Sequence, residues 1–215
     1  MDSEPRSAKG RRTRARLIDA GKRVFERDGF LQARISDIAS EAEVSHGSFY
    51  HYFDSKESLF REIAAEVEVR LVSMDDTGGD GERPAGPIDR IRAANRSYLT
   101  AYRDEAAIMR VIEEVSRYDE DVRRIRTERD DQLAARLEAA IARLQAEGLA
   151  DARIDTRYAA QALGGMVARF AETLFFGSGS FDLDTAVDQL TLLWANSLGL
   201  TENRSRAERG AAGAA

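Results

Sequence analysis

Residues 34–60 of the chain read RISDIASEAEVSHGSFYHYFDSKESLF. Apolar residues recur at helical spacing in the first part of this stretch, and the pattern breaks at Val44 and Ser45. A second apolar pair follows, formed by Phe49 and Phe53, which are four residues apart and so share one helical face. The stretch therefore predicts two short helices separated by a turn, followed by the start of a third helix.

The ends of these helices also have sequence signals. Ser45 is suited to cap the second helix, because its hydroxyl can accept a hydrogen bond from an amide that the first turn leaves unpaired. Asp54, with Glu57 three residues later, predicts a capped start for the third helix. At about 100° per residue, Gly47 and His51 face away from the phenylalanine pair, toward where a DNA major groove would fit. The pattern indicates a helix-turn-helix that reads DNA.

The spacings across roughly residues 11–62 resemble those of the TetR-type bacterial transcriptional regulators. The matching positions are Gly29-Phe30, Ile35-x-x-Ile38-Ala39, Val44-Ser45-x-Gly47-x-Phe49-Tyr50-x-x-Phe53 and Lys56-Glu57-x-Leu59. Arg34 departs from the pattern, because that family commonly has Thr or Ser there as the cap of the first short helix. We therefore expect Ser36, or no side chain, to cap this helix.

Ten residues of the motif are expected to meet DNA: Arg34, Ser36, Ser45, His46, Gly47, Ser48, Tyr50, His51, Tyr52 and Lys56. Tyr50 is expected to donate to a phosphate and Lys56 to approach the DNA backbone, whereas His46 and His51 are expected to reach base edges. Core packing is the alternative for the aromatic residues. We assign both phenylalanines of the motif to the core and leave Tyr52 open between the two roles.

The net charge of −6 is unevenly distributed along the chain. Residues 6–23 carry one acidic residue, Asp19, and eight basic ones: Arg6, Lys9, Arg11, Arg12, Arg14, Arg16, Lys22 and Arg23. A basic stretch near a terminus can be a solubilising tail. Because this one lies beside the helix-turn-helix, we predict that it is a phosphate-binding face.

Composition limits which other classes of protein the chain can belong to. A chain of 215 residues with 43% hydrophobic residues suits one or two globular domains. Cysteine is absent, and His46 and His51 lack the i, i+4 spacing of paired metal ligands, so we expect neither a metal nor another cofactor. No apolar run approaches the roughly 20 residues that span a bilayer. We expect no membrane partner and a cytoplasmic, nucleoid-associated protein.

The predicted fold class is all-α, with a three-helix DNA-binding domain before a larger helical domain. Helices are expected near residues 11–28, from 55 past 71, 88–103, 105–117, 120–147, 156–176 and 183–199, with Gly29 as a left-handed stop and 73–87 as a loop. The predicted division is a disordered basic arm at 1–10, a helix-turn-helix domain at 11–62, an effector-binding and dimerisation domain at 63–200 and a disordered tail at 201–215.

The last two predicted helices, 156–176 and 183–199, carry apolar residues on more than one face. Such helices are either central to a domain or covered by a second subunit, and an ordinary intramolecular core stays open as an explanation. The resemblance implies that they form a homodimer interface. A two-fold dimer would bind double-stranded DNA at an inverted-repeat operator.

The resemblance also implies a pocket for a small-molecule effector in the C-terminal domain. Apolar walls with a few polar groups suit a small, largely apolar ligand, although ordinary cores have the same composition. The candidate ligand-binding residues are Asn95, Tyr98, Tyr102, Met109, Glu113, Met166, Arg169, Phe170 and Thr173.

The leading hypothesis is a repressor that its ligand releases from DNA. Within DNA binding, the alternative is an activator or architectural protein without an effector. An all-helical enzyme is opposed by the absence of a nucleophile elbow, a glycine-rich phosphate loop or a metal-spaced cluster, and Glu113 and Glu114 point about 100° apart. Arg34 gives some weight to a protein that has lost its DNA contact.

Overall fold

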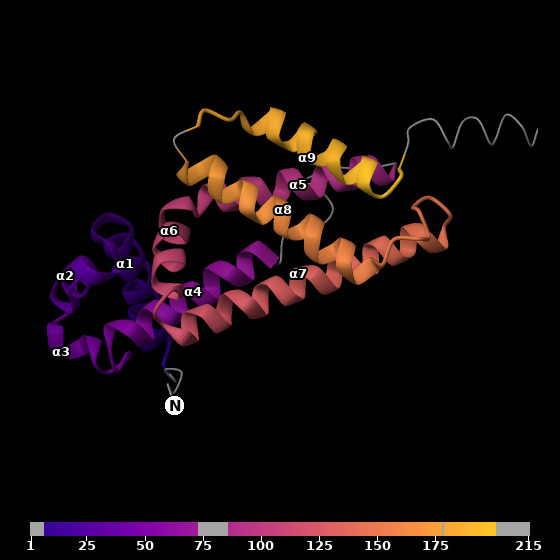
Figure 1. Cartoon of the computed structure of the whole chain (residues 1–215). Helices are drawn as coiled ribbons and strands as arrows, with labels where there is room; N and C mark the ends of the chain where they lie inside the picture. The colour runs from indigo at the N-terminus through magenta and orange to yellow at the C-terminus, as the bar shows by residue number, and fades with distance from the viewer. Residues whose placement is uncertain (1–6, 73–85, 178, 201–215) are drawn as a thin grey trace, which may run out of the picture. The chain divides into compact units, whose positions relative to one another are not determined.

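The computed structural model of the chain describes residues 7–72, 86–177 and 179–200. Over these ranges the chain forms nine α-helices and no strand, which confirms the predicted all-α class. The helices are α1 Ala8–Gln32, α2 Ile35–Glu41, α3 His46–Phe49, α4 Lys56–Val72, α5 Pro87–Asp104, α6 Ala106–Ser116, α7 Glu120–Ala146, α8 Thr156–Phe176 and α9 Leu183–Ser197 (Figure 1). None of these described helices is both long enough and apolar enough to cross a membrane.

Three predicted features fall wholly or partly outside the described residues. They are residues 1–6 of the basic arm, most of the 73–87 loop and the tail from Thr201. The rest of the arm is in the first helix, because α1 begins at Ala8 rather than at the expected Arg11. Ser7 caps it by accepting a hydrogen bond of 3.0 Å from the amide of Gly10.

The chain divides into two compact units. Unit 1 comprises the described residues of Met1–Arg70 and Glu105–Arg129, and unit 2 those of Leu71–Asp104 and Asp130–Ala215. Unit 1 thus contains α1 to α3, most of α4, all of α6 and the start of α7. The segment Glu105–Arg129 lies far beyond residue 62 in the sequence, yet it packs with the N-terminal helices.

The core of unit 1 forms where α1 and α4 approach closely. A Cβ on Gly21 of α1 would lie only 2.7 Å from Cδ2 of Leu59 on α4, so any larger residue would force the Leu59 side chain to move. The rings of Phe25 and Phe30 meet Phe60 of α4 edge to face, with centroid distances of 5.0 and 4.9 Å. Each buried aromatic side chain contributes about 1.5–3 kcal/mol. These contacts fix the two longer helices that support the short ones.

Gly29 has the positive φ that the sequence predicts, with φ 74°. The backbone departs from helical geometry there, and one further turn ends α1 at Gln32. Phe30, directly after the break, points into the core of unit 1 and is 6% exposed. The glycine therefore turns the chain so that Phe30 can reach α4.

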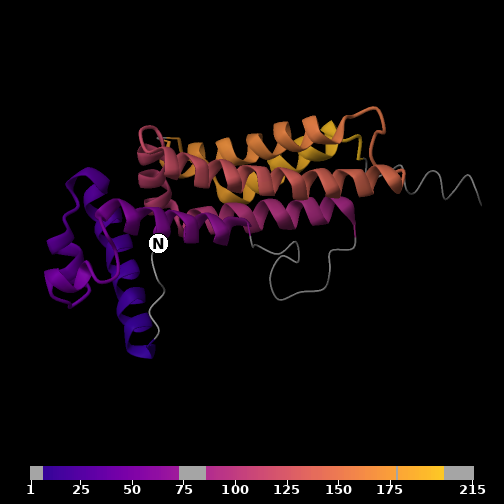
Figure 2. The same ribbon diagram turned by 90° about the horizontal axis from the view of Figure 1, so that it is seen from below.

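In unit 2, α5 packs against α8 and α9 (Figure 2). Asn95 of α5 is buried, and its Nδ2 donates to Oγ1 of Thr191 on α9 over 3.2 Å. Gly164 of α8 lies against α7, because a Cβ there would be 2.8 Å from Cδ1 of Leu137. Helices from the beginning and the end of this unit's sequence thus pack together, and α8 lies against α5, α7 and α9.

Candidate DNA-binding interface

The α3 helix is short and capped as predicted. Ser45 has extended backbone angles, and its Oγ accepts a hydrogen bond of 3.2 Å from the amide of Ser48. The helix proper ends at Phe49, and the chain continues as a tight turn in which the amides of Tyr52 and Phe53 both donate to the carbonyl of Phe49. The recognition segment is therefore one helical turn followed by a second, tighter one.

This segment has the two faces that its sequence predicts. Phe49 and Phe53 are 0% and 1% exposed, which confirms their core role. Gly47 and His51 are exposed, and Tyr50 keeps 50% of its surface accessible. The outward face therefore carries an aromatic hydroxyl, an imidazole and bare backbone, which can meet phosphates and base edges.

Neighbouring rings constrain the exposed aromatic side chains. The His46 ring lies edge to face with Tyr50 at a centroid distance of 5.6 Å, and Tyr50 also contacts Phe49 at 5.5 Å. His46 is exposed, whereas Ser48 and Tyr52 are half-buried. The half-buried position of Tyr52 leaves both of its predicted roles open.

The start of α2 has no side-chain cap, which was one of the two expectations for it. Arg34 occupies the N-cap position with extended backbone angles and makes no side-chain cap hydrogen bond. The hydroxyl of Ser36 donates instead to Oδ1 of Asp37 over 3.3 Å. Arg34 and Ser36 are both exposed, so both are accessible to DNA.

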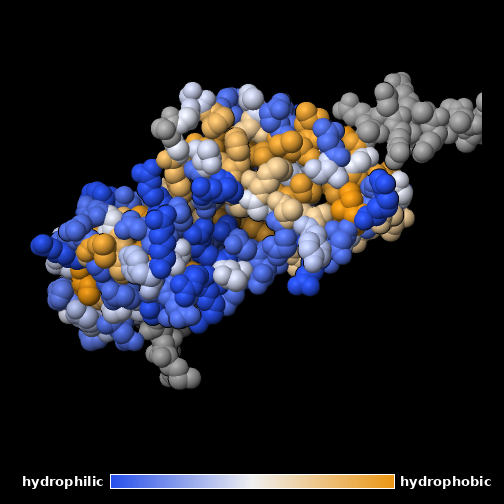
Figure 3. Space-filling view, in the orientation of Figure 1, coloured by the Kyte–Doolittle hydropathy of each residue, from blue (hydrophilic) through white to orange (hydrophobic). Residues whose placement is uncertain are grey.

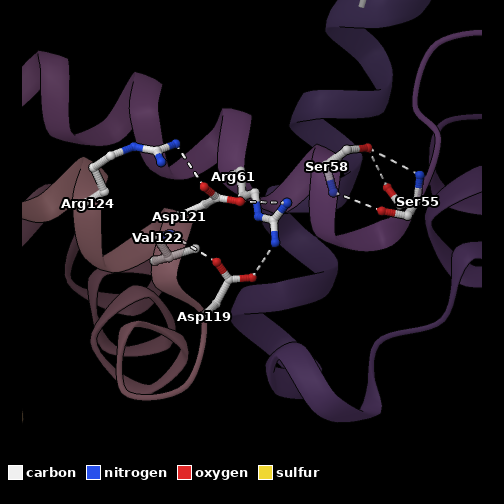
Figure 4. A network of polar contacts seen from close by, with 7 residues as sticks. All are labelled: Ser55, Ser58, Arg61, Asp119, Asp121, Val122 and Arg124. Carbon is white, nitrogen blue, oxygen red and sulfur yellow. Dashed lines mark hydrogen bonds and ion pairs between the residues drawn. The ribbon is translucent and has the colours of Figure 1, made fainter. Parts of the chain in front are cut away.

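The start of α4 corrects a predicted cap. The cap is formed by Ser55 and Ser58, not by Asp54 and Glu57 (Figure 4). The Ser58 amide donates to Ser55 Oγ over 3.1 Å, and the Ser55 amide donates to Ser58 Oγ over 3.2 Å. The prediction placed the cap one residue too early, because the hydroxyl of Ser58 takes the place of the Glu or Gln side chain that usually completes a capping box.

Lys56 has a structural role that the sequence did not reveal. Its Nζ donates to the carbonyls of Phe30 and Ala33 over 2.8 and 2.9 Å and lies 4.6 Å from the centre of the Phe30 ring. Two of its three ammonium protons therefore serve carbonyls at the end of α1. As a DNA contact, Lys56 stays a prediction.

Several side chains of the basic stretch are engaged within unit 1. Lys22 Nζ lies 2.6 Å from Glu105, Arg23 Nε lies 2.9 Å from Glu41, and Arg16 reaches Glu43 at 3.0 Å. Arg14 forms a two-pronged contact with Glu62 of α4, and its guanidinium lies 5.0 Å from the centre of the Phe53 ring. The carboxylate partners are far away in the sequence, so charge counting along the chain did not find these pairs.

Three other basic residues lie on the surface at the beginning of α1. Lys9, Arg11 and Arg12 are exposed along the first turns of α1, and Arg6 lies outside the described residues. A phosphate-binding face formed by these residues stays a prediction. Further along the helix, the basic side chains mostly hold α1 to its neighbours.

Arg61 joins α4 to the turn before α7 (Figure 4). Its guanidinium contacts Asp119 at 2.8 Å and Asp121 at 3.0 Å, and Asp119 Oδ1 also accepts from the Val122 amide over 3.0 Å. Burial acts to raise the pKa of Asp119, but the hydrogen bonds from Arg61 and Val122 outweigh it, so the pKa lies below its ordinary value. Asp119 therefore both caps α7 and anchors α4.

A second ionic contact between the same helices is deeply buried. Glu68 of α4 is 2% exposed, and its carboxylate lies 3.4 Å from Nε of Arg129 and 3.8 Å from Nε of Arg126. Arg129 is 4% exposed. A buried pair of this kind is costly to break, because the remaining charge would be left without compensation. The α4 helix is thus joined to the start of α7 by two ionic contacts, one at Arg61 and one at Glu68.

The candidate ligand-binding residues are divided between the units. Met109 and Glu113 belong to unit 1, and Met109 is fully buried there. The other seven belong to unit 2. Asn95 and Tyr102 are buried on α5, and the Tyr102 ring lies between 5.8 and 6.1 Å from those of Tyr98, Phe175 and Phe176.

The α8 members of this set differ in exposure. Arg169 and Thr173 are exposed, and Arg169 pairs with Glu172 at 2.5 Å, while Met166 and Phe170 are half-buried. The Phe170 ring meets Phe181 at 5.3 Å. The structure therefore buries Asn95 and Tyr102 within unit 2 and leaves Arg169 and Thr173 on its surface. Among the described residues, no group of three or more metal-ligating side chains could hold a metal ion.

Both parts of the chain match one family of proteins. Residues 17–63 match the family described as "Bacterial regulatory proteins, tetR family". Residues 84–172 match the description "Tetracyclin repressor-like, C-terminal domain". The chain belongs to the TetR family. This TetR-family protein is therefore a DNA-binding transcriptional regulator and not an enzyme.

Individual TetR-family relatives are similar to this chain over a limited part of their length. HTH-type transcriptional regulator YdgC of Bacillus subtilis (strain 168) is 34% identical over 70 residues, which are 33% of this chain and 36% of that protein. The repressor KstR2 of Rhodococcus jostii (strain RHA1) is 44% identical over 54 residues, which are 25% of this chain and 26% of KstR2. The alignments thus span little more than a third of these relatives at most.

The likeness to solved structures extends over the whole fold. The fatty acid degradation regulator FadR from Bacillus halodurans superposes with a TM-score of 0.73 at 18% identity. The match covers 92% of this chain and 100% of that one. At this level of identity the likeness establishes a shared fold.

Proposed function

We propose that this TetR-family protein is a homodimeric repressor that binds an inverted-repeat operator in double-stranded DNA. A small, largely apolar ligand bound in the C-terminal domain releases it. The observation that carries the DNA-reading part is the exposed face of the α3 segment, with His46, Gly47, Tyr50 and His51 opposite two buried phenylalanines. The relative KstR2, which is 44% identical over 54 residues, is named a transcriptional repressor.

The ten predicted contact residues divide into two groups by exposure. The exposed ones are Arg34, Ser36, Ser45, His46, Gly47, Tyr50 and His51, and the half-buried ones are Ser48, Tyr52 and Lys56. We propose that Arg34, Tyr50 and the exposed start of α1 bind phosphates, which fixes the position of the protein without reading sequence. The two histidines then supply donors or acceptors to base edges.

Dimerisation through α8 and α9 is supported by their uncovered face. Leu192 and Leu193 of α9 are 52% and 50% exposed, and Tyr158 of α8 is 78% exposed. Hydrophobic residues gather over these helices on the surface of unit 2 (Figure 3). A Cβ on Gly165 would meet no atom within 4 Å, so α8 leaves room there for a closely packed partner helix. Exposed apolar patches of this kind mark protein interfaces.

The ligand proposal is supported by the aromatic cluster in unit 2. Tyr98 and Tyr102 of α5 and Phe175 and Phe176 of α8 offer an apolar wall, with the buried amide of Asn95 two turns away on α5. Such walls with few polar groups suit small apolar ligands. To release DNA, the ligand must bind better to the state that cannot hold the operator.

In this proposal, residues 11–62 form the DNA-binding domain and residues 63–200 the effector-binding and dimerisation domain. Helix α4 leaves the first and enters the second. Helix α7 begins in unit 1, where it forms ion pairs with α4, and continues into unit 2, so its backbone can pass a ligand signal to α4.

The test is selection of bound duplexes from a random-sequence pool at about 150 mM salt, where non-specific phosphate attraction is weakened. We expect an inverted repeat bound roughly a thousandfold more tightly than scrambled DNA of equal length. Failure to enrich any sequence would contradict a sequence-specific repressor. Quenching of Trp194, the only tryptophan, then gives a ligand readout that does not depend on DNA.

A further inference from the structure

The turn between α2 and α3 contains an unfavourable backbone conformation. Glu43 has φ 52°, and it is the only residue other than glycine with a positive φ in the part of the chain that the structure describes. The left-handed region brings Cβ close to the carbonyl oxygen, so residues with a side chain rarely adopt it. Because Glu43 lies between the two short helices, its backbone sets the direction in which α3 leaves α2.

Arg16 of α1 holds this turn at three points. Its Nη2 donates to the carbonyl of Ala42, lies 3.0 Å from Oε2 of Glu43, and reaches the carbonyl of Glu43 at 3.5 Å. The neighbouring residue Leu17 is fully buried, so the helix from which Arg16 extends is fixed to the core of unit 1. Charge-assisted hydrogen bonds of this kind are stronger than neutral ones.

The position of the guanidinium also suits the end of α2. The carbonyls at the C-terminal end of a helix lack amide partners and carry partial negative charge, so a cation there is favourable. An exposed arginine-carboxylate pair alone is worth little. The contact with the turn carbonyls is what distinguishes Arg16 from the other surface pairs of α1.

We propose that Arg16 is a positioning residue that stabilises the strained α2–α3 turn and so orients α3 for sequence-specific binding. This inference rests on the DNA-binding function. It removes Arg16 from the phosphate-binding face, although its place in the basic stretch suggested that role.

The two roles give different binding data. A phosphate contact strengthens binding to every duplex. The plot of log K against log salt has a negative slope, and loss of one such contact makes that slope less negative by about 0.9. A positioning residue affects the duplex whose bases are read and leaves the salt slope unchanged. Arg16→Ala in the full chain separates these cases.

The first experiment measures binding of wild-type and Arg16→Ala protein to two duplexes between about 100 and 300 mM salt. One is the duplex that wild-type protein best recovers from a random-sequence pool, and the other is its scrambled form. We expect roughly tenfold weaker binding to the recovered duplex, less than twofold change on the scrambled one, and an unchanged slope. Equal losses on both duplexes, or no loss on either, would overturn the proposal.

A matched control is Arg92→Ala, which removes an exposed ion pair of 2.6 Å with Asp188 in unit 2. It is expected to leave both affinities unchanged. The variant Glu43→Gly relieves the backbone conformation, because glycine adopts positive φ without steric cost. In that background, Arg16→Ala is expected to weaken binding to the recovered duplex by less than threefold.

Hydrogen exchange tests the same inference without DNA. The amides of Glu43 and Val44 donate to carbonyls at the end of α2, and the amide of Ser48 donates to the carbonyl of Ser45 at the start of α3. In Arg16→Ala they are expected to exchange about tenfold faster, whereas amides of α5 keep their wild-type rates. Unchanged exchange at the turn would overturn the proposal. If the wild type selects no sequence, that outcome counts against the repressor assignment, and the exchange data still decide the role of Arg16.

Discussion

Ser45 contributes to the fold through a single hydroxyl. Its Oγ accepts from the Ser48 amide at the start of a helix of only four residues. Replacing such a cap with alanine costs about 1 kcal/mol. We expect Ser45→Ala to lower the free energy of unfolding by about this amount in urea denaturation. Ser40→Ala, an exposed change within α2, is the control, and an equal loss in both variants would show that the cap is not responsible.

Lys56 has two candidate roles, as a donor to the carbonyls at the end of α1 and as a DNA contact. Lys56→Met keeps the alkyl chain over Phe30 but leaves the carbonyls of Phe30 and Ala33 without their donor. We expect a loss of stability of about 1–2 kcal/mol in the same assay, because these are charge-assisted bonds in a half-buried position. Unchanged stability together with a lower salt slope of DNA binding would instead identify Lys56 as a phosphate contact.

At the scale of elements, the link between α4 and the start of α7 depends on ionisation. Asp119 has a pKa below its ordinary value, because the hydrogen bonds from Arg61 and the Val122 amide outweigh the effect of burial. A carboxylate of this kind stabilises the folded state above its unfolded pKa, and that contribution is lost as pH falls through the folded pKa. The link is therefore intact at neutral pH and weakens below about pH 4.

Asp119→Asn tests this dependence. We expect it to lower the free energy of unfolding by about 1 kcal/mol at pH 7, and the difference from wild type to shrink as pH falls below about 4 and through the lowered pKa of Asp119. Asp121→Asn is the matched control, since Asp121 contacts the same arginine but is more exposed, at 38% against 12%. A difference that stays constant with pH would contradict an ionic role for Asp119.

At the scale of the whole molecule, the exposed leucines of α9 connect assembly to DNA binding. If α8 and α9 form the dimer interface, Leu192→Asp with Leu193→Asp places two charges on each side of it. We expect monomers in sedimentation velocity and operator binding weakened by more than a hundredfold, because both half-sites must be engaged together. Helicity by circular dichroism should be retained, since both side chains are about half exposed. A dimer that persists would locate the interface elsewhere.

Local sequence signals determined much of this protein. Helical periodicity and capping residues predicted the helix-turn-helix, the Ser45 cap, the Phe49 and Phe53 core pair and the break at Gly29. Each of these depends on interactions between residues close together in the chain, which is why spacing alone was enough to find them.

Only the tertiary structure decided the roles of the charged residues. Arg14, Arg16 and Lys22 belong to one basic stretch of the sequence. Their carboxylate partners nevertheless come from three separate places, which are α4, the α2–α3 turn and Glu105, respectively. The packing of Glu105–Arg129 with the N-terminal helices could not be predicted from the sequence either. Such contacts join residues distant in the chain, and long-range pairing of charges leaves no periodic signal. Sequence thus determined the local elements, and folding determined which charges remain available for DNA.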